Sequence, residues 1–286
     1  MDDVDALGAA DYGRYTEANR ATWNLWLAHD IGSDHHKDVA RYRATGSSLR
    51  PIELAELHER VAGRSLLHLQ CSLGSETLSW ARLGARVTGI DISDEAIRYA
   101  QALAEESGLS EQARFIRSDL YRLPDALDET FDVVFASYGA LCWAPDLAGW
   151  AQIAARYVAP GGELLLIDLH PVGMALDTVR NDASGRSLRL DRPYFHPHEH
   201  PPEPPTAPQA GQTSDEPPVF AWGYGLGEAV SAVAATGLRI ASLGEYPYAH
   251  WRQFPQLVES GDGYWRWPDP ANQLPLLFSL RATRPE

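Results

Sequence analysis

Small, polar and acidic residues stand at two points where an apolar run of the sequence ends. One run leads into Gln70-Cys71-Ser72-Leu73-Gly74, and the run at 87–90 ends at Asp91. In doubly wound α/β sheets, ligands bind beyond the carboxyl ends of the strands. An acidic residue at the end of a second strand can accept hydrogen bonds from both hydroxyls of a ribose, and its charge strengthens them. The pattern predicts a nucleotide-type ligand at this edge.

Two further residues have side chains that could take part in a reaction. They are Tyr138 and His170, which follow the apolar runs at 131–136 and 163–167. They would lie at the carboxyl ends of later strands of the same sheet. Histidine titrates near neutral pH and can act as a general base. We predict Tyr138 and His170 as candidate catalytic residues, with a hydrogen-bonded structural histidine as the alternative for His170.

Aromatic residues are numerous, with 9 Trp and 12 Tyr, and several lie outside the apolar runs. Their rings can stack on a planar substrate or face a cation. We predict Trp23, Trp143, Trp222 and Tyr224 as substrate-binding residues, while most other rings serve packing. The alternating histidines at 196, 198 and 200 lie among prolines, which indicates a solvated loop, and no metal site is predicted.

The elements that must position these residues alternate between strand-length apolar runs and helix-like segments. The runs are 65–70, 85–90, 114–117, 131–136 and 163–167, and the helical segments are 76–83, 94–107 and 146–157. Continuous apolar runs that alternate with helices are typical of a parallel sheet covered on both faces. Pro160-Gly161-Gly162 predicts the turn before the fifth strand.

The chain divides into four predicted parts. Residues 1–60 form an N-terminal helical cover, with helices at 11–29 and after Pro51, and residues 61–170 form the α/β core. Residues 171–221 form a proline-rich lid insertion, because its prolines cannot join a central sheet. Residues 222–286 complete the core with a helix at 226–236 and strands at 238–243 and 276–282.

Composition excludes several classes of partner. The 286-residue chain has 24 Lys+Arg against 39 Asp+Glu, a net charge of −15, so it repels a nucleic-acid backbone. The longest apolar stretch, 164–167, is far shorter than the ~20 residues of a membrane span. The acidic N-terminus is unlike a signal peptide. Two cysteines in apolar surroundings favour reduced thiols, so we predict a cytoplasmic protein.

The order of these motifs resembles the class I S-adenosylmethionine-dependent methyltransferases. The resemblance covers roughly residues 60–170 and 222–283 and implies a seven-stranded sheet with an antiparallel last strand. The matching segments are Leu67–Gly74, Gly89-Ile90-Asp91-Ile92-Ser93, Ser118-Asp119-Leu120, Phe131-Asp132-Val133-Val134-Phe135, Pro160-Gly161-Gly162 and 275–282.

The resemblance implies S-adenosylmethionine as cofactor and a role for each matching residue. Asp91 would hold the ribose, Ile92 and Leu120 would enclose the adenine, and Asp119 would accept from its amine. The methionine part would face Gln70, Cys71, Ser72 and Gly74, with Ser137 below it. The alternatives are a helix cap for Asp91, a turn or cap for Asp119, and simple packing for Cys71.

One departure from the family concerns its first motif, which has three glycines after an acidic residue. Here the corresponding residues are His68, Gln70, Ser72 and Gly74, which resembles a bacterial branch with a glycine-poor loop. That branch usually has a histidine in place of Tyr224. A diphosphate requires close backbone approach, which Gln70 and Ser72 would hinder, whereas S-adenosylmethionine has no phosphate.

The resemblance therefore implies methyl transfer, and the acidic charge together with the aromatic residues predicts a small planar or cationic acceptor, in secondary metabolism. N- or O-methylation is favoured and C-methylation stays open, because fold alone does not choose the acceptor. The alternatives are a catalytically inactive methyltransferase-like protein that binds the cofactor, and an NAD-dependent oxidoreductase. The oligomeric state is left open.

Overall fold

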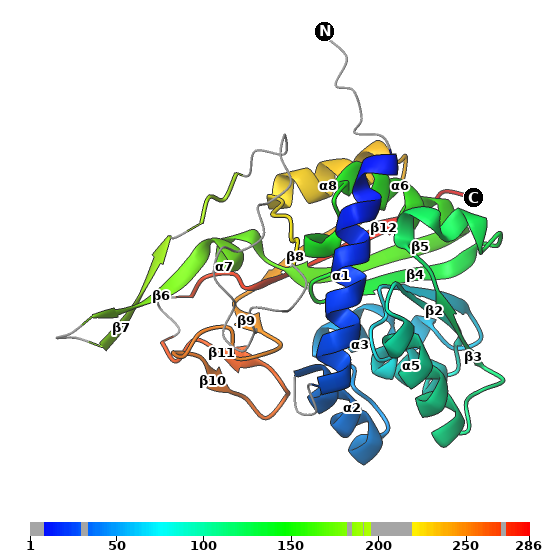
Figure 1. Ribbon diagram of the computed structural model, residues 1–286, viewed down its shortest axis with the longest axis horizontal. Helices are drawn as coiled ribbons and strands as arrows, with labels where there is room; N and C mark the ends of the chain where they lie inside the picture. Colours follow the sequence, from blue (N-terminus) through cyan, green and yellow to red (C-terminus); the bar gives the residue numbers. More distant parts are fainter. Residues whose placement is uncertain (1–8, 30–33, 182–184, 191, 196–218, 270–272) are drawn as a thin grey trace, which may run out of the picture.

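A seven-stranded sheet forms the centre of the protein, seen here in a computed structural model that describes residues 9–29, 34–181, 185–190, 192–195, 219–269 and 273–286 (Figure 1). The strand order is β3-β2-β1-β4-β5-β12-β8. β12 is antiparallel to both neighbours, and the pairs among β1 to β5 are parallel. The strands are β1 (Ser65–Leu69), β2 (Arg86–Asp91), β3 (Ala113–Arg117), β4 (Phe131–Ser137), β5 (Val158–Leu169), β8 (Arg239–Tyr246) and β12 (Leu277–Thr283). The predicted doubly wound fold is confirmed.

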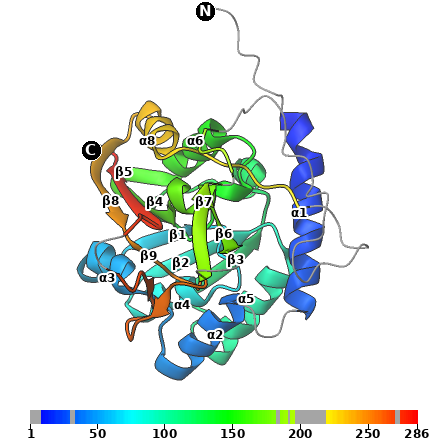
Figure 2. The same cartoon turned by 90° about the vertical axis from the view of Figure 1, so that its left-hand side faces the viewer.

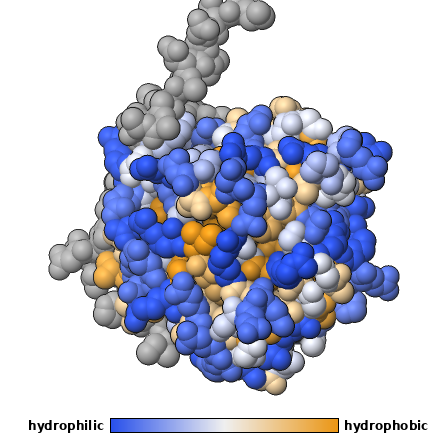
Figure 3. Space-filling model, turned by 90° about the vertical axis from the view of Figure 1, so that its right-hand side faces the viewer, coloured by the Kyte–Doolittle hydropathy of each residue, from blue (hydrophilic) through white to orange (hydrophobic). Residues whose placement is uncertain are grey.

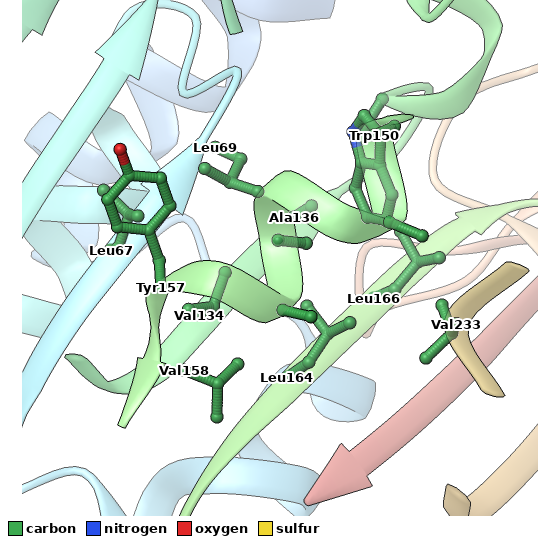
Figure 4. Close-up of a cluster of buried hydrophobic side chains, with 14 of the residues drawn as sticks. Leu67, Leu69, Val134, Ala136, Trp150, Tyr157, Val158, Leu164, Leu166 and Val233 are labelled. Carbon is green, nitrogen blue, oxygen red and sulfur yellow. The ribbon is translucent and has the colours of Figure 1, made fainter. Parts of the chain in front are cut away.

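Both faces of the sheet are buried, which explains the continuous apolar runs. On one face, α6 (Leu147–Tyr157) and α8 (Leu226–Ala235) cover Leu67, Leu69 and Leu166 (Figures 2 and 4). On the other, α3 (Pro51–Leu57) and α4 (Ser75–Arg82) pack with Leu66 and Phe135. Neighbouring residues of one strand thus belong to opposite cores, as the two-residue period of a strand requires.

α5 (Asp94–Glu106) and α4 approach β3 closely, and Gly74 permits this approach. Gly74 is the N-cap of α4 with φ 78°. A Cβ atom on it would lie 2.7 Å from Ala100 Cβ and 2.9 Å from Phe115 Cε1. Both the left-handed backbone and the tight packing therefore favour glycine at this position.

The N-terminal cover consists of α1 (Ala9–His29), α2 (Asp34–Thr45) and α3, followed by η1 (His58–Arg60). α1 lies beside the sheet (Figure 2), where Asn19 exchanges two 2.8 Å hydrogen bonds with the backbone of Phe220. α2 was not predicted, because its sequence is mostly polar. Val39 and Tyr42 of α2 are buried against the core.

Three segments differ from the sequence-based expectation. Pro160-Gly161-Gly162 lies inside the long β5 as an irregularity of its pairing rather than as a separate turn. In the lid insertion, the described residues form α7 (Pro171–Ala175) and a hairpin of β6 (Leu176–Asn181) and β7 (Gly185–Leu190) (Figure 1). Residues 248–266 form a small sheet of β9 (Tyr248–Ala249), β10 (Val258–Glu259) and β11 (Trp265–Arg266). The proline-rich residues 196–218, with their three histidines, lie outside the described part.

One face of the molecular surface is shown by hydropathy in Figure 3. The face on the right-hand side of Figure 1 is mainly hydrophilic, with hydrophobic side chains gathered near its centre (Figure 3). Among the helices that the structure describes, none has the length and apolar character to cross a bilayer.

We expect Gly74→Ala to lower the free energy of unfolding by about 2–4 kcal/mol, because it adds steric overlap to left-handed backbone strain. Gly237→Ala is the matched control: Gly237 has φ 87°, but a Cβ atom there meets nothing within 4 Å. Urea denaturation should give a loss of about 1–2 kcal/mol for the control. Equal losses for the two variants would contradict the packing argument.

Candidate functional site

A cavity of about 500 Å³ opens at the carboxyl ends of β1, β2, β3 and β4. It lies where the strand order reverses between β1 and β4, the position at which doubly wound sheets bind ligands. Most predicted site residues line it: Trp23, Gln70, Cys71, Ser72, Asp91, Ile92, Asp119, Leu120, Ser137, Tyr138 and Trp143. Four predicted residues are not part of this lining: Gly74, His170, Trp222 and Tyr224.

The loop after β1 keeps a glycine-like backbone although two of its residues carry side chains. Gln70 has φ 56° and Ser72 has φ 48°, a conformation that costs a non-glycine residue ~1–2 kcal/mol. The Gln70 amide donates to the Ala140 carbonyl (2.9 Å) and accepts from Trp150 Nε1 (3.0 Å). The Ser72 N–H donates to Asp91 Oδ2 (2.9 Å). These bonds compensate the strain, so the glycine-poor motif retains its loop.

Asp91 is held on both sides by backbone amides. Its Oδ2 accepts from Ser72 and its Oδ1 accepts from the N–H of Ser93 at 2.9 Å. Burial raises the pKa of Asp91, and these hydrogen bonds act in the opposite direction. The N-cap of α5 is Ser93, which accepts from the Ala96 N–H, so Asp91 is not the helix cap. Each carboxylate oxygen can accept further bonds from the cavity.

Asp119 lies beyond β3 and serves as a cap while it lines the cavity. It is the N-cap of η2 (Leu120–Asp125), and its Oδ1 accepts from the Tyr121 N–H at 2.9 Å. Ile92 and Leu120 contribute apolar surface to the same wall. A flat ring between them could meet the second oxygen of Asp119.

Glu76, which was not predicted as a site residue, lines the cavity beside Ser137. Its Oε2 accepts from Ser137 Oγ at 2.5 Å. His68 lies behind, with Nδ1 2.8 Å from Thr77 Oγ1 and Nε2 3.3 Å from Ser137 Oγ. Burial lowers the pKa of His68 to about 3, so its ring is neutral. The one signal in the sequence that could have indicated Glu76 is its position, two residues after Gly74 in the loop that follows the first strand.

A buried charge cluster continues behind Glu76. Arg50 Nη2 lies 2.6 Å from Asp38 Oδ1, and Arg50 Nη1 lies 3.6 Å from Glu76 Oε1. Glu53 is fully buried nearby. Burial raises the pKa of both Glu53 and Glu76, and their mutual repulsion adds to the shift at Glu76. Asp38 and Glu76 line the cavity, while Arg50 is not among its lining residues.

Tyr138 lines the cavity beyond β4 in a strained conformation, with φ 43°. Its hydroxyl lies 3.3 Å from that of Tyr264, and its ring centroid lies 4.2 Å from that of His250. Burial raises the pKa of Tyr138 well above its ordinary value. The phenol is therefore neutral and can orient a ligand by a hydrogen bond, but it is a poor general base.

His170 has a structural position that differs from the predicted catalytic one. It is the N-cap of α7, where its Nδ1 accepts from the Val172 N–H at 3.1 Å. Its Nε2 lies 2.9 Å from Glu245 Oε1 on β8. Burial lowers the pKa of His170 despite this carboxylate. Both ring nitrogens are thus engaged outside the cavity lining, which corresponds to the structural alternative.

Trp222 and Tyr224 support a cavity wall from behind. The Trp222 N–H donates to the Cys142 carbonyl (2.8 Å), and the Tyr224 hydroxyl donates to the Ala144 carbonyl (2.6 Å). Both bonds reach the segment that holds Trp143 and η3 (Leu141–Trp143). In this structure Trp222 and Tyr224 lie outside the described lining and brace its wall, and their contact with a substrate stays a prediction.

The lining contains four tryptophans: Trp23, Trp26, Trp143 and Trp251. The Trp23 centroid lies 5.3 Å from those of both Trp26 and Trp143. The Trp251 ring contacts His250 at 4.4 Å. Within the described residues, no group of three or more His, Cys, Asp or Glu is placed to hold a metal ion.

Comparisons with known proteins agree with this geometry. A family model described as "Methyltransferase domain" matches residues 67–166. Sterol 24-C-methyltransferase ERG6B of Gibberella zeae is 30% identical over 202 residues, which are 66% of this chain and 50% of that protein. The ubiquinone biosynthesis O-methyltransferase of Hahella chejuensis is 35% identical over 118 residues, 41% of this chain and 48% of that protein. The chain thus spans about half the length of these relatives.

A solved S-adenosylmethionine-dependent methyltransferase from Mesorhizobium loti has the same fold. The likeness has a TM-score of 0.56 at 20% identity and covers 82% of this chain and 96% of that one. The strand order, the loop after β1 and the matched segment at 67–166 lead to one assignment: the chain contains a methyltransferase domain and has the fold of the S-adenosylmethionine-dependent methyltransferases.

Proposed function

We propose that the protein transfers a methyl group from S-adenosylmethionine to a small-molecule acceptor, by N- or O-methylation, in the cytoplasm. The observation that carries the proposal is the single cavity, which joins Asp91 and Asp119 to the tryptophan rings. A cofactor and a small acceptor can therefore meet in one space. The two free cysteines, Cys71 and Cys142, fit a reducing compartment.

The residues present fit the cofactor. Asp91 has its carboxylate fixed and retains acceptor capacity for two ribose hydroxyls. Ser72 lines the cavity with a buried Oγ that has no hydrogen-bond partner among the described residues. That hydroxyl is available to the amino-acid part of a ligand at the loop. Gln70 turns its side chain toward Ala140 and Trp150, so it leaves the loop surface accessible.

S-adenosylmethionine, when bound, supplies a methyl group on a positively charged sulfur. The chain has to hold an acceptor in line with that methyl group and exclude water from the reacting centre. The four tryptophans provide apolar walls that exclude water, and the neutral Tyr138 hydroxyl can orient the acceptor. Tyr138 acts as a positioning residue, and His170, whose ring nitrogens bond outside the cavity lining, takes part in no catalytic step.

The alternative with the most support is a methyltransferase-like protein that binds the cofactor without turnover, because strained non-glycine residues occupy its first motif. An NAD-dependent oxidoreductase has less support, since carboxylates of the cavity would repel a diphosphate. Binding and turnover measurements separate the three.

We expect calorimetric titration to show binding of S-adenosylmethionine and S-adenosylhomocysteine but not of NAD. Asp91→Ala should weaken S-adenosylhomocysteine binding by about 1.5–3 kcal/mol, a tenfold to hundredfold rise in Kd, because it removes charged hydrogen bonds to the ribose. Asp91→Asn, which preserves the shape, should retain part of the affinity.

Asp125→Ala is the matched control, because Asp125 is exposed on η2 and is not among the residues that line the cavity. Its Kd should equal that of the wild type. Tight NAD binding, or unchanged affinity in Asp91→Ala, would contradict the assigned cofactor site.

We expect label from methyl-labelled S-adenosylmethionine to reach small amines or alcohols in an acceptor panel, and not protein or RNA. Trp251→Leu should raise the KM of the best acceptor at least fivefold, since an aromatic face of the lining is lost. Trp265→Leu, outside this lining, is the control. A protein that binds cofactor but labels nothing would favour the inactive alternative.

A further inference from the structure

The lining of the cavity is acidic. Four of its residues are carboxylates, Asp38, Glu76, Asp91 and Asp119, and none of its described residues is Lys or Arg. An acidic cavity with low-dielectric walls attracts cations and repels phosphate or carboxylate groups.

Arg50 contacts two carboxyl groups of this wall, and it does not reverse the charge. Its side chain is 5% exposed and lies between Asp38 at 2.6 Å and Glu76 at 3.6 Å. Glu53 adds a third carboxyl group to the same cluster. One guanidinium thus faces three carboxyl groups, and Asp38 and Glu76 also border the cavity.

The strand order separates a cofactor half of the cavity from an acceptor half. Asp91 and Asp119 follow β2 and β3, on one side of β1. Tyr138 follows β4 on the other side. Its ring centroid lies 4.2 Å from that of His250, which in turn lies 4.4 Å from the centroid of Trp251, so the three rings form a continuous series. Glu76 contacts Ser137 at the end of β4 and so lies between the halves.

We infer that the methyl acceptor is an amine, bound as its ammonium form by the Trp251 ring and the carboxylate of Glu76. The inference rests on the proposed function and deepens it. A cation over an indole face is attracted by the ring, and the attraction grows when water is excluded. The acidic lining supplies the remaining charge, whereas an acceptor with a carboxylate or phosphate would be repelled by the acidic residues of the lining.

Glu76 also provides a destination for the proton that the acceptor must lose. Its carboxylate takes one proton from the ammonium group, which frees the nitrogen lone pair. That lone pair forms the new N–C bond while the methyl carbon leaves sulfur, and sulfur retains the bonding pair as a neutral thioether. The methylated nitrogen then carries the positive charge. Burial raises the pKa of Glu76 to about 8, so the group holds a proton readily, and an ammonium group beside it favours the charged carboxylate that the pairing requires.

The test is a charge series on the protein saturated with S-adenosylhomocysteine. Calorimetry compares 2-phenylethylamine, 2-phenylethanol and 3-phenylpropanoate, which share a ring and a short chain but differ in charge. We expect the amine to bind at least tenfold more tightly than the alcohol, and the carboxylate more weakly than either. A carboxylate that binds as tightly as the amine, or an amine that does not bind, would overturn the inference.

Two variants locate the amine site. Glu76→Gln and Trp251→Leu should each weaken the amine at least fivefold while the alcohol changes less than twofold. Glu105→Gln, exposed on α5, and Trp265→Leu are matched controls with unchanged affinity. Equal losses for amine and alcohol in Glu76→Gln would show that Glu76 recognises no charge, and would overturn its role.

These measurements also distinguish a failure of this inference from a failure of the proposed function. Failure of S-adenosylhomocysteine to bind would remove the proposed function itself. Glu76 could instead bind the ammonium group of the cofactor's own amino-acid part. In that case Glu76→Gln would weaken S-adenosylhomocysteine but not 5′-methylthioadenosine, which lacks that part, and would leave the amine unchanged. That result would overturn the acceptor assignment while the cofactor site stands.

Discussion

The carboxylate of Asp91 is the interaction on which the ligand edge depends. It accepts from the backbone of Ser72 on one side and of Ser93 on the other, and so connects the loop after β1 to the start of α5. Two residues of the loop have left-handed backbones that glycine would adopt without strain. Because Asp91 and the Gln70 side chain fix this backbone, the loop needs fewer glycines than its family, and its amides are positioned before a ligand arrives.

The same principle explains which glycines cannot be replaced. Gln70 and Ser72 have room for side chains, because one turns toward Trp150 and the other toward the cavity. At Gly74 and Gly89, a Cβ atom would lie 2.7 Å from Ala100 and from Phe115, respectively. The sequence departs from the family where only backbone strain has to be balanced, and retains glycine where α4, α5 and β3 approach closely.

Sequence reasoning found the sheet because its strands are buried on both faces and read as unbroken apolar runs. It missed α2, whose few buried residues stand in a polar sequence, and the two-residue strands β9, β10 and β11, which are too short for a pattern. It placed Asp91 and Tyr138 at the cavity because strand ends share one edge, and Asp119 there through the family resemblance. It misplaced His170, since the chain turns there into α7, and it overlooked Glu76, whose importance depends on burial beside Arg50 and Ser137.

Part of the cavity lining lies within the residues that match the methyltransferase domain model, and part lies outside them. Only for the first part can similarity to relatives indicate what a residue does. Asp91, Asp119 and the loop at 70–74 all lie within residues 67–166, the part that the methyltransferase domain model matches. Trp23 and Trp26 come from α1, and His250 and Trp251 follow β9, so this part of the wall lies outside the match. The domain match therefore covers the cofactor half and also Glu76, Tyr138 and Trp143, but not these rings. The choice of acceptor also depends on the rings that the cover and the segment after β9 contribute, and their part has to be derived from this structure.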